Sequence, residues 1–301
     1  MSESPQTVPV CYRHPGRETY VRCTRCDRPI CPDCMRDAAV GHQCPECVAE
    51  GLRTQRPART AFGGGAAGRA GYVTKTLIGL NVLMMLLSIA SAGGGGIAGG
   101  GLGGLMGGQT PLTLWGSVLP YAIYDGALHG VADGEYYRLV TAMFLHYGVL
   151  HLLLNMWALW VLGRSLETAL GPLRFAALYL VAGLGGNVAA YWLSAENTTS
   201  AGASTAIFGL FAALFVIMRR LGRDTSAVIP ILVINLIFTF TVPSISIAGH
   251  LGGMVTGGAL ALVLAYAPRT RRTLVQSVGI GAIVVLLIAL VVARTVALLV
   301  G

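Results

Sequence analysis

Seven long apolar segments follow one another along most of this chain, and they leave room for few folds other than a bundle of membrane-spanning helices. Each is close to the roughly 20 apolar residues that an α-helix needs to cross the hydrocarbon core of a bilayer. We expect them at 73–91, 147–164, 173–194, 203–219, 225–242, 246–267 and 274–294. Only 11% of the residues are charged, against roughly 25% in soluble domains. The sequence therefore predicts an all-α polytopic membrane protein.

Basic residues in the short loops predict how these segments are oriented. Short cytoplasmic loops concentrate Lys and Arg, and the outer loops of a chain whose N-terminus is cytoplasmic would hold almost no basic residue except Arg138. Arg294, at the outer end of the last segment, can reach the interface with its long side chain. This orientation places three groups of arginines inside: Arg164 with Arg174, Arg219 with Arg220 and Arg223, and Arg269 with Arg271 and Arg272. We expect a multi-pass protein of the cell membrane with seven spans and a cytoplasmic N-terminus.

The start of the sequence and the outer loop after the first span bear on how this part of the chain is placed in the membrane. No pattern of a cleavable signal peptide opens the sequence, so we expect this span to act as its own insertion signal. Residues 93–108 after it are rich in glycine, which disfavours helix, and we expect a flexible insertion in the outer loop. The stretch PLTLWGSVLPYAIY at 111–124 mixes aromatic and aliphatic residues and is expected to lie in the membrane interface.

Polar side chains occur near the outer ends of three predicted spans. The second, fourth and sixth spans all begin at the outer surface, and their first turns carry His151 with Asn155, Ser204, and His250. At ~1.5 Å of rise per residue, these groups fall in one slab of the membrane. Ionisable residues there are costly and are candidates for function. Hydrogen bonding between helices is the alternative interpretation of each histidine, including His146.

Ser204 and His250 form the predicted catalytic pair. A serine hydroxyl is a weak nucleophile until a base such as imidazole takes its proton. No Asp or Glu lies in the fourth or sixth predicted span, so we expect a dyad rather than a triad. Backbone N–H groups at the start of the fourth span, including that of Ser204, lack partners within the helix and can bind an oxyanion. His151 and Asn155, four residues apart on one helical face, can add two donors. Small neighbours leave room for a close helix or a substrate: Gly202, Ala203 and Ala206.

Five motifs in order resemble the rhomboid family of intramembrane serine proteases over residues 73–267. They are YR at 137–138, where the family usually has Trp-Arg, HYGVLHLLLN at 146–155, GRSLETALG at 163–171, GASTAIFG at 202–209 and GHLGGMVTG at 249–257. Each motif alone is weak, whereas their joint occurrence in this order is specific. The resemblance implies a core of six spans, to which the seventh is an addition.

The resemblance also implies roles for individual residues. Ser204 would be the nucleophile and His250 the general base, with His151 and Asn155 in the oxyanion site. No cofactor is needed for that chemistry. Glu167 and Arg138 are interpreted as structural, because Glu167 lies at the cytoplasmic end of its span and the resemblance implies that Arg138 anchors the outer loop.

Other positions near the dyad are compared with the family in the same way. Phe208 lies where the family has an aromatic residue that packs on the catalytic histidine, and Gly253 and Gly257 suit close packing of the sixth span against the fourth. The family commonly has Gly after the nucleophile, where this sequence has Thr205. A β-branched residue restricts the backbone and adds bulk, so we expect Thr205 to modify the rate or the choice of substrate without abolishing activity.

All seven cysteines lie in the polar head, between residues 11 and 47. Together with His14 they form four pairs, each spaced by two residues, which is a pattern typical of zinc ligands. Alternating pairs would give one site from Cys11, His14, Cys31 and Cys34 and another from Cys23, Cys26, Cys44 and Cys47. This spacing resembles an interleaved B-box-type zinc finger over residues 11–47, although His42 could replace Cys44 or Cys47. Disulfides are disfavoured, because pairing would leave one cysteine over in a reducing compartment.

Two structural zinc ions are therefore expected, since four protein ligands leave no open position for a catalytic water. The head and the linker behind it are basic: 11 of the 21 Lys and Arg residues lie between residues 1 and 75. Anionic membrane lipid is one partner that this charge favours. A protein partner is preferred for the zinc domain, and nucleic acid is disfavoured because neither a recognition helix nor interleaved stacking aromatics is present.

The sequence thus predicts four parts: a double zinc-binding domain at 1–50, a basic glycine-rich linker at 51–72, a six-helix protease core at 73–267, and a cytoplasmic loop with a seventh helix at 268–301. We expect a serine endopeptidase that cleaves transmembrane segments of other membrane proteins, with an active site that opens to the outer face. The alternative is a catalytically silent relative that binds client membrane proteins. A small-solute transporter is not supported, because neither broken helices nor an internal repeat is found.

Overall fold

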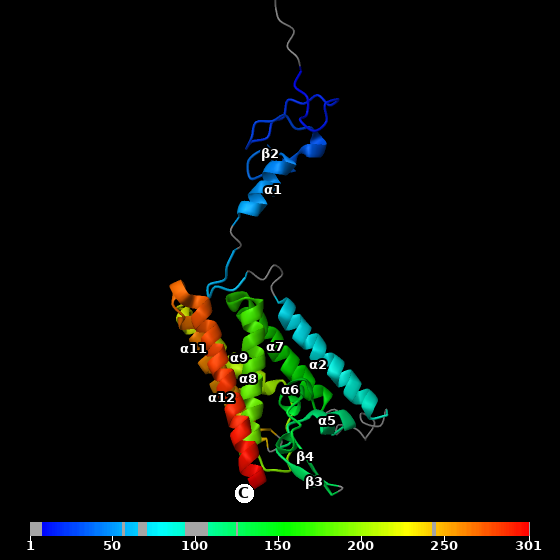
Figure 1. Cartoon of the computed structure of the whole chain (residues 1–301), viewed down its shortest axis with the longest axis vertical. Helices are drawn as coiled ribbons and strands as arrows, with labels where there is room; N and C mark the ends of the chain where they lie inside the picture. Colours follow the sequence, from blue (N-terminus) through cyan, green and yellow to red (C-terminus); the bar gives the residue numbers. More distant parts are fainter. Residues whose placement is uncertain are drawn as a thin grey trace, which may run out of the picture. The chain divides into compact units, whose positions relative to one another are not determined.

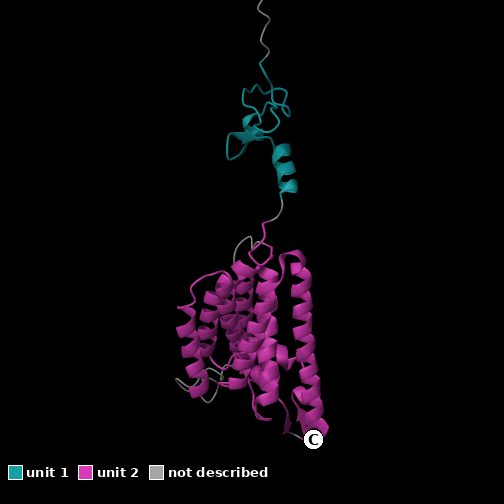
Figure 2. Ribbon diagram, turned by 90° about the vertical axis from the view of Figure 1, so that its left-hand side faces the viewer, with its two compact units in different colours: residues 1–57 teal, residues 58–301 magenta. Residues whose placement is uncertain are grey.

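The computed structural model describes residues 8–55, 58–65, 71–93, 108–124, 126–242 and 245–300. The chain divides into two compact units, residues 1–57 and 58–301 (Figure 2). Residues 94–107, which make up nearly all of the predicted glycine-rich insertion, lie outside the described residues.

The first unit holds little regular structure, and its buried side chains are mainly cysteines. Its elements are a short 3-10 helix η1 (Pro32–Cys34), strands β1 (Arg36–Asp37) and β2 (His42–Gln43), and helix α1 (Pro45–Thr54). The two strands pair antiparallel. Cys44 precedes α1 and its sulfur accepts the backbone N–H of Cys47, while Pro45 occupies the first turn, where its missing N–H costs nothing. Residues 51–54, expected in the linker, instead complete α1.

The second unit contains one helix for each of the seven predicted spans (Figure 1). They are α2 (Tyr72–Ser91), α7 (Val149–Leu170), α8 (Pro172–Leu193), α9 (Ser204–Arg220), α10 (Val228–Thr241), α11 (Ile247–Tyr266) and α12 (Arg272–Val300). Five of these are long and apolar enough to cross a membrane, whereas α9 has 17 residues and α10 has 14. The chain is a multi-pass membrane protein.

Helices α8, α9 and α11 pack closely at the centre of this unit, because glycines allow their backbones to meet. A Cβ atom at Gly253 of α11 would collide with the carbonyl oxygen of Thr205 in α9, and one at Gly257 would collide with Gly209. Small residues commonly serve as the contact points between membrane helices. The two helices that carry Ser204 and His250 are therefore held at backbone contact.

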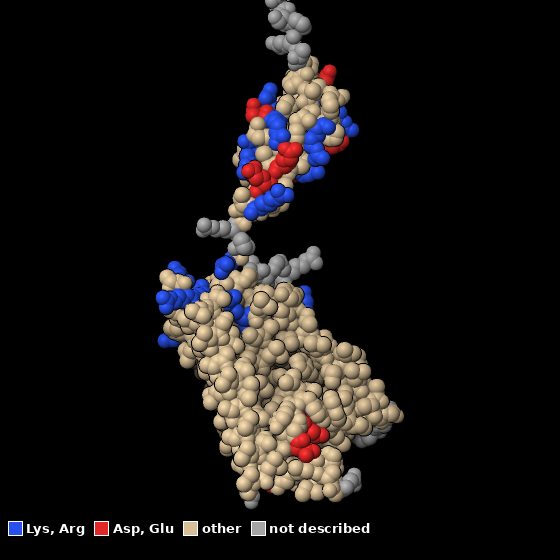
Figure 3. Space-filling model, in the orientation of Figure 1, with Lys and Arg blue, Asp and Glu red and all other residues tan. Residues whose placement is uncertain are grey.

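The outer surface of the bundle is mostly apolar, and its basic residues gather at one end. On the face shown in Figure 3, the Lys and Arg residues of the second unit collect at the end where α2 begins. Large apolar side chains are exposed along the outer helices, as expected of surfaces that face lipid; they include Leu153, Leu154 and Trp157 of α7, Ile237 and Phe238 of α10, and Val285, Leu286 and Ile288 of α12.

The segment between α2 and α7 folds into short elements at the opposite end of the bundle. These are α5 (Pro111–Gly116), the antiparallel hairpin of β3 (Ala122–Tyr124) and β4 (Ala127–His129), η2 (Val131–Asp133), α6 (Arg138–Thr141) and η3 (Ala142–Phe144). The hairpin and the pair β1–β2 are the short strand pairs among the described residues, and the predicted all-α membrane fold is confirmed by the helices of the second unit. The predicted interfacial stretch at 111–124 forms α5 and β3.

Arg138 holds this segment together from a buried position. Its Nη1 donates to the carbonyl oxygens of Leu114 and Ser117 at 2.7 and 3.1 Å, and its Nε donates to Glu135 Oε2 at 2.6 Å. Burial by itself would raise the pKa of the Glu135 carboxyl, but the bonds from Arg138 and from the Gly130 N–H outweigh it and lower that pKa. Arg138 thus acts here as an anchor of the loop.

Residues 58–65, expected in a flexible linker, belong to the second unit and pack against its helices. Phe62 is buried in its core, and Gln276 of α12 donates its amide to the carbonyl oxygens of Phe62 and Leu264 at 3.2 and 2.8 Å. The sequence predicts this contact poorly, because a single aromatic residue in a stretch rich in Gly and Arg is a weak indication that the residue is buried.

Glu167 caps a helix that is distant in sequence. Helix α2 begins after Gly71, which offers no side chain to its free N–H groups. The fully buried carboxylate of Glu167 accepts the N–H groups of Val73 and Thr74 at 2.9 Å each, and the Thr74 hydroxyl at 2.8 Å. A negative charge at a helix N-terminus is also favoured by the helix dipole.

We expect Glu167→Gln to lower the stability of the second unit by about 1–3 kcal/mol, because one amide N–H₂ would face backbone donors that then remain unpaired. All four tryptophans lie beyond residue 57, so the midpoint of thermal unfolding in detergent, followed by tryptophan fluorescence, reports this unit. Thr168→Ala is the control, since the exposed Thr168 hydroxyl bonds only to Arg164 of its own helix. Equal midpoints for the two variants would contradict the capping role.

Candidate active site and metal-binding unit

Ser204 and His250 meet at the end of the bundle that carries the loop segment. Ser204 is the first residue of α9, and its Oγ lies 2.8 Å from Nε2 of His250 on α11. His250 is buried, and Ser204 is partly accessible. The ring of Phe208, one turn further along α9, stacks on the His250 ring with centroids 4.1 Å apart and an interplanar angle of 19°. A hydroxyl within hydrogen-bond reach of an oriented imidazole is the arrangement that activates a nucleophile.

Gly202 shapes the entry into α9. Its φ of +146° lies in a region that L-residues with side chains rarely adopt, and its N–H donates to the Ala142 carbonyl at 2.9 Å. A Cβ atom at this position would lie 3.0 Å from the His151 ring and 3.2 Å from Ser204 Oγ. Only glycine brings the chain this close to both side chains.

Two backbone N–H groups at the start of α9 differ in whether they make a hydrogen bond within the described part of the protein. The Ala203 N–H donates to Nε2 of the buried His146 at 3.5 Å. The Ser204 N–H has no acceptor among the residues that the structure describes. It remains available to an oxygen atom placed beside Ser204 Oγ.

The two predicted oxyanion side chains lie one turn apart on the same face of α7. The ring of His151 lies beside Gly202, 3.0 Å from the position that a Gly202 Cβ atom would take, and it contacts the His146 ring edge-on at 4.9 Å between centroids. Asn155 is one turn further along α7, where its Nδ2 donates to the His151 carbonyl at 2.8 Å. The His151 ring and Ser204 Oγ thus border the same point, the place that a Gly202 Cβ atom would take. Asn155 keeps one amide hydrogen free but makes no hydrogen bond to Ser204 within the described part of the chain.

Thr239 is a further contact of His250, and the sequence did not predict this contact. Its buried hydroxyl, on α10, lies 2.8 Å from His250 Nδ1. A search for an acidic partner overlooks a hydroxyl, and one threonine in an apolar segment gives no signal of its own. Knowledge of how α10 is rotated against α11 is needed to find this pair.

Thr205 points away from the serine and into the helix packing. Its side chain is buried against Gly186 of α8 and Gly249 of α11. Its Oγ1 has no hydrogen-bond partner among the described residues. The bulk that we expected beside the oxyanion site lies instead between helices, so any influence of Thr205 on reactivity would pass through the spacing of α8, α9 and α11.

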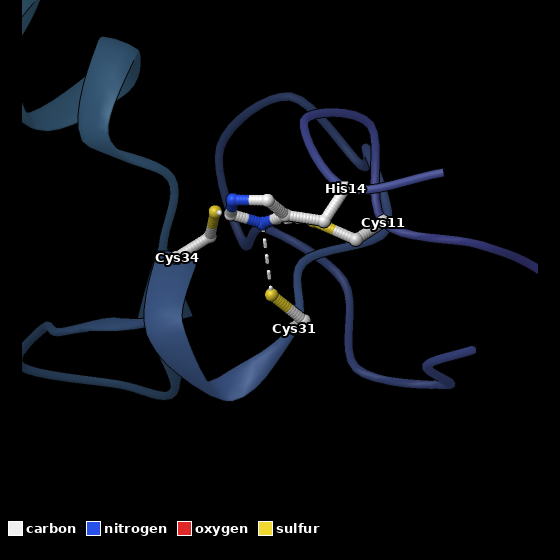
Figure 4. A group of neighbouring side chains, drawn as sticks. All are labelled: Cys11, His14, Cys31 and Cys34. Carbon is white, nitrogen blue, oxygen red and sulfur yellow. Dashed lines mark hydrogen bonds between the residues drawn. The ribbon is translucent and has the colours of Figure 1, made fainter. Parts of the chain in front are cut away.

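In the first unit, the predicted ligands gather in two groups of four that alternate along the chain. One group contains Cys11, His14, Cys31 and Cys34, and its ligand atoms lie within 4.8 Å of one another (Figure 4). His14 turns Nδ1 toward the sulfurs, at 3.3 Å from Cys31, 3.4 Å from Cys34 and 3.8 Å from Cys11. A tetrahedron with zinc bond lengths has S···N edges of about 3.5 Å, so these atoms fit a tetrahedral metal ion.

The second group consists of Cys23, Cys26, Cys44 and Cys47, with the same mutual spacing. Cys26 Sγ and Cys44 Sγ are 3.8 Å apart, close to the S···S edge of about 3.8 Å in a tetrahedral zinc site. Arg28 donates Nε to Cys26 Sγ at 3.3 Å. This bond is the main cause of a lowered pKa at Cys26, and it favours the thiolate form that a metal requires.

His42 lies outside both groups of ligands. Its Nδ1 is 3.3 Å from Asp37 Oδ1 in the pair β1–β2, and the second group is complete without it. The alternative in which His42 replaces Cys44 or Cys47 is therefore not the arrangement seen in the structure.

Comparison with known proteins relates the second unit to one family. The family model described as Rhomboid domain matches residues 133–267. The chain is 36% identical over 148 residues to the protein named "Putative rhomboid protease YdcA" of Bacillus subtilis (strain 168), and this match covers 48% of the chain and 74% of YdcA. It is 40% identical over 135 residues to "Rhomboid protease GluP" of the same organism, covering 42% of the chain and 26% of GluP.

A plant protein gives a similar match. The chain is 34% identical over 166 residues to "RHOMBOID-like protein 5" of Arabidopsis thaliana, covering 52% of the chain and 53% of that protein. The chain thus spans about half the length of the plant protein and about a quarter of GluP.

We expect Gly202→Ala to slow the reaction of Ser204 with a fluorophosphonate by about tenfold or more, because displacing the His151 ring or the serine by even 1 Å is costly at a reacting centre. The measurement is the labelling rate of the purified protein in lipid vesicles. Gly222→Ala is the matched control, since Gly222 also has a positive φ, +67°, but a Cβ atom there meets nothing within 4 Å. A similar loss in both variants would attribute the effect to backbone strain alone.

Proposed function

Because this chain belongs to the rhomboid family, we propose that it is an intramembrane serine endopeptidase with Ser204 as its nucleophile and His250 as its general base. The observation that carries the proposal is the 2.8 Å separation of Ser204 Oγ and His250 Nε2 at the N-terminal end of α9. The free Ser204 N–H beside that hydroxyl supports it further.

The proposed reaction has two halves. His250 Nε2 takes the Ser204 proton as Oγ attacks a peptide carbonyl carbon, and the resulting imidazolium then protonates the leaving amine as the C–N bond breaks. A water molecule gives its proton to His250 and attacks the acyl-enzyme, and the proton returns to Ser204 Oγ as the new carboxyl product leaves. The overall reaction is hydrolysis of one peptide bond.

Three donors are proposed to stabilise the oxyanion that forms in each half. The Ser204 N–H lies at the positive end of the α9 dipole, the His151 ring lies beside Gly202 at the entry to α9, and the free amide hydrogen of Asn155 can turn toward the site. Donors already in place when charge develops supply the largest share of such catalysis.

We propose transmembrane segments of other membrane proteins as the substrates. The peptide carbonyl that reacts must be free of helical hydrogen bonds, because a helical carbonyl is bonded and shielded. Small, helix-destabilising residues near the scissile bond would therefore favour cleavage. With the N-terminus in the cytoplasm, as the arginine loops favour, the dyad opens toward the outer face.

We propose that the first unit binds two zinc ions and that they are structural. Each group supplies four protein ligands and keeps no position for a catalytic water. The unit has few buried apolar side chains besides its cysteines, so metal binding would supply much of its folding free energy. A protein partner, or anionic lipid at the inner leaflet, is the proposed target of this unit.

A catalytically silent member that binds membrane proteins is the second candidate. Such a protein would need the helix packing but not the alignment of a hydroxyl, an imidazole and a free N–H. The presence of Ser204, His250, His151 and Asn155 together argues against it.

We expect a fluorophosphonate to label the wild-type protein at Ser204 in lipid vesicles, as mapped by peptide mass spectrometry. Labelling should disappear in Ser204→Ala and in His250→Ala, because neither the hydroxyl alone nor the base alone gives an activated nucleophile. Ser165→Ala, at an exposed position of α7, should label like the wild type. A folded wild-type protein that resists the probe would favour the silent candidate.

The metal proposal predicts two zinc ions per chain by atomic spectroscopy of the purified protein. Cys31→Ser and Cys44→Ser should each remove about one ion, because each breaks a different group of four ligands. His42→Ala should retain both, since His42 lies outside both groups. Loss of an ion in the His42 variant would overturn the proposed ligand set.

A further inference from the structure

We propose that Thr239 of α10 is a positioning residue that fixes the tautomer of His250 by accepting a hydrogen bond from its Nδ1–H. This inference rests on the proposed function, because it assigns the third group that orients the general base. Thr239 touches neither Ser204 nor the position of a substrate, and it acts only through His250.

The direction of the bond follows from the neighbours of the Thr239 hydroxyl. Its Oγ1 lies 2.8 Å from the carbonyl oxygen of Asn235, one turn earlier in α10, and also 2.8 Å from His250 Nδ1. A carbonyl oxygen can only accept, and a hydroxyl has one hydrogen to donate. When the hydrogen is used on Asn235, the Oγ1 lone pairs face the imidazole, and Nδ1 carries the proton in this bond. This is the arrangement that we propose.

The other nitrogen of the ring then has the form that the reaction needs. A neutral imidazole protonated on Nδ1 has an unprotonated Nε2, and Nε2 is the atom 2.8 Å from Ser204 Oγ. The opposite tautomer would point an N–H at the serine and could not accept its proton. When His250 becomes an imidazolium during the reaction, the Thr239 oxygen remains an acceptor for the Nδ1–H.

The helices that carry Ser204, Thr239 and His250 hold no acidic residue that could accept the Nδ1–H in place of Thr239. The sequences of α9, α10 and α11 contain no Asp or Glu. Phe208 stacks on the face of the ring and fixes its plane, but a stacked hydrocarbon ring cannot choose between two tautomers. Thr239 is the polar side chain placed at Nδ1.

The position of Thr239 also ties α10 to the active site. Val228 and Thr239 are the buried residues of α10, at opposite ends of the helix, and most of its other large side chains are exposed. The hydrogen bond to His250 is therefore a main contact of the end of α10 that lies next to the dyad. A substitution at Thr239 could act on helix docking or on the tautomer, and the experiment must separate these effects.

The test compares Thr239→Val, Thr239→Ser and Thr241→Val in vesicles, with the labelling rate of Ser204 and the kcat and KM for a transmembrane peptide as readouts. Valine keeps the shape and removes the acceptor, whereas serine keeps it. Thr241 is the matched control, because it is exposed on the same helix and its hydroxyl makes the same kind of bond, to Ile237 at 2.8 Å. Tryptophan fluorescence checks that each variant unfolds at a similar temperature.

We expect Thr239→Val to lower the labelling rate and kcat about 10- to 100-fold with KM nearly unchanged, a smaller loss than that seen when a triad aspartate is replaced. Thr239→Ser should recover most of the rate, and Thr241→Val should match the wild type. Equal rates for the wild type and Thr239→Val would overturn the inference while leaving the proposed function intact.

Nitrogen NMR of the ¹⁵N-histidine protein provides a readout that does not depend on activity. In the wild type, Nδ1 of neutral His250 should give a protonated signal and Nε2 an unprotonated one, with the signals identified by their loss in His250→Gln. In Thr239→Val the opposite tautomer should gain population. A wild-type ring protonated on Nε2 would refute the positioning role, and it would do so even if the protein failed to react with the probe.

Discussion

The candidate active site depends on the contact between the backbones of α9 and α11. Gly253 lies against the Thr205 carbonyl and Gly257 against Gly209, so these helices approach more closely than any side chain at those positions would allow. Ser204 precedes Thr205, and His250 lies one helical turn before Gly253. The same contact that packs the bundle therefore sets the 2.8 Å separation between the hydroxyl and the imidazole. In a membrane, where apolar lipid offers little driving force for helix association, such close packing is a principal source of stability.

Polar groups inside the bundle are satisfied mainly by backbone atoms rather than by opposite charges. The Glu167 carboxylate bonds to two N–H groups of α2, the Arg138 guanidinium bonds to two carbonyl oxygens besides Glu135, and the Gln276 amide bonds to two more. Each joins segments that are far apart in the sequence. An unsatisfied polar group in an apolar medium is costly, so these bonds specify where the helix ends and loops must lie.

The sequence predicted the parts of the structure that depend on periodicity and depth. The seven apolar segments became seven helices, and the depth argument that grouped Ser204, His250 and His151 agrees with their observed proximity. Cysteine spacing likewise anticipated the alternation of the two ligand groups. The rest depended on tertiary contacts. Thr239 faces His250 only because of the rotation of α10. Phe62 packs into the core where Gln276 bonds to its carbonyl oxygen, and Thr205 points between helices because Gly186 and Gly249 leave space there.

The proposed dyad with a hydroxyl partner suits this location better than a triad with a carboxylate would. An aspartate at Nδ1 would be an ionised group in an apolar bundle, and its desolvation would cost several kcal/mol unless further donors surrounded it. Glu167 shows what such a carboxylate requires here, since three donors bond to it at a helix end. Next to His250, the Gly249 N–H is already bonded to Ser246 Oγ and the His250 N–H to the Ser246 carbonyl, so neither could surround a carboxylate. A neutral threonine accepts the Nδ1–H while its own hydrogen is already bonded to Asn235. It would therefore orient His250 without burying a charge. In return, a neutral hydroxyl stabilises the imidazolium less than a carboxylate would.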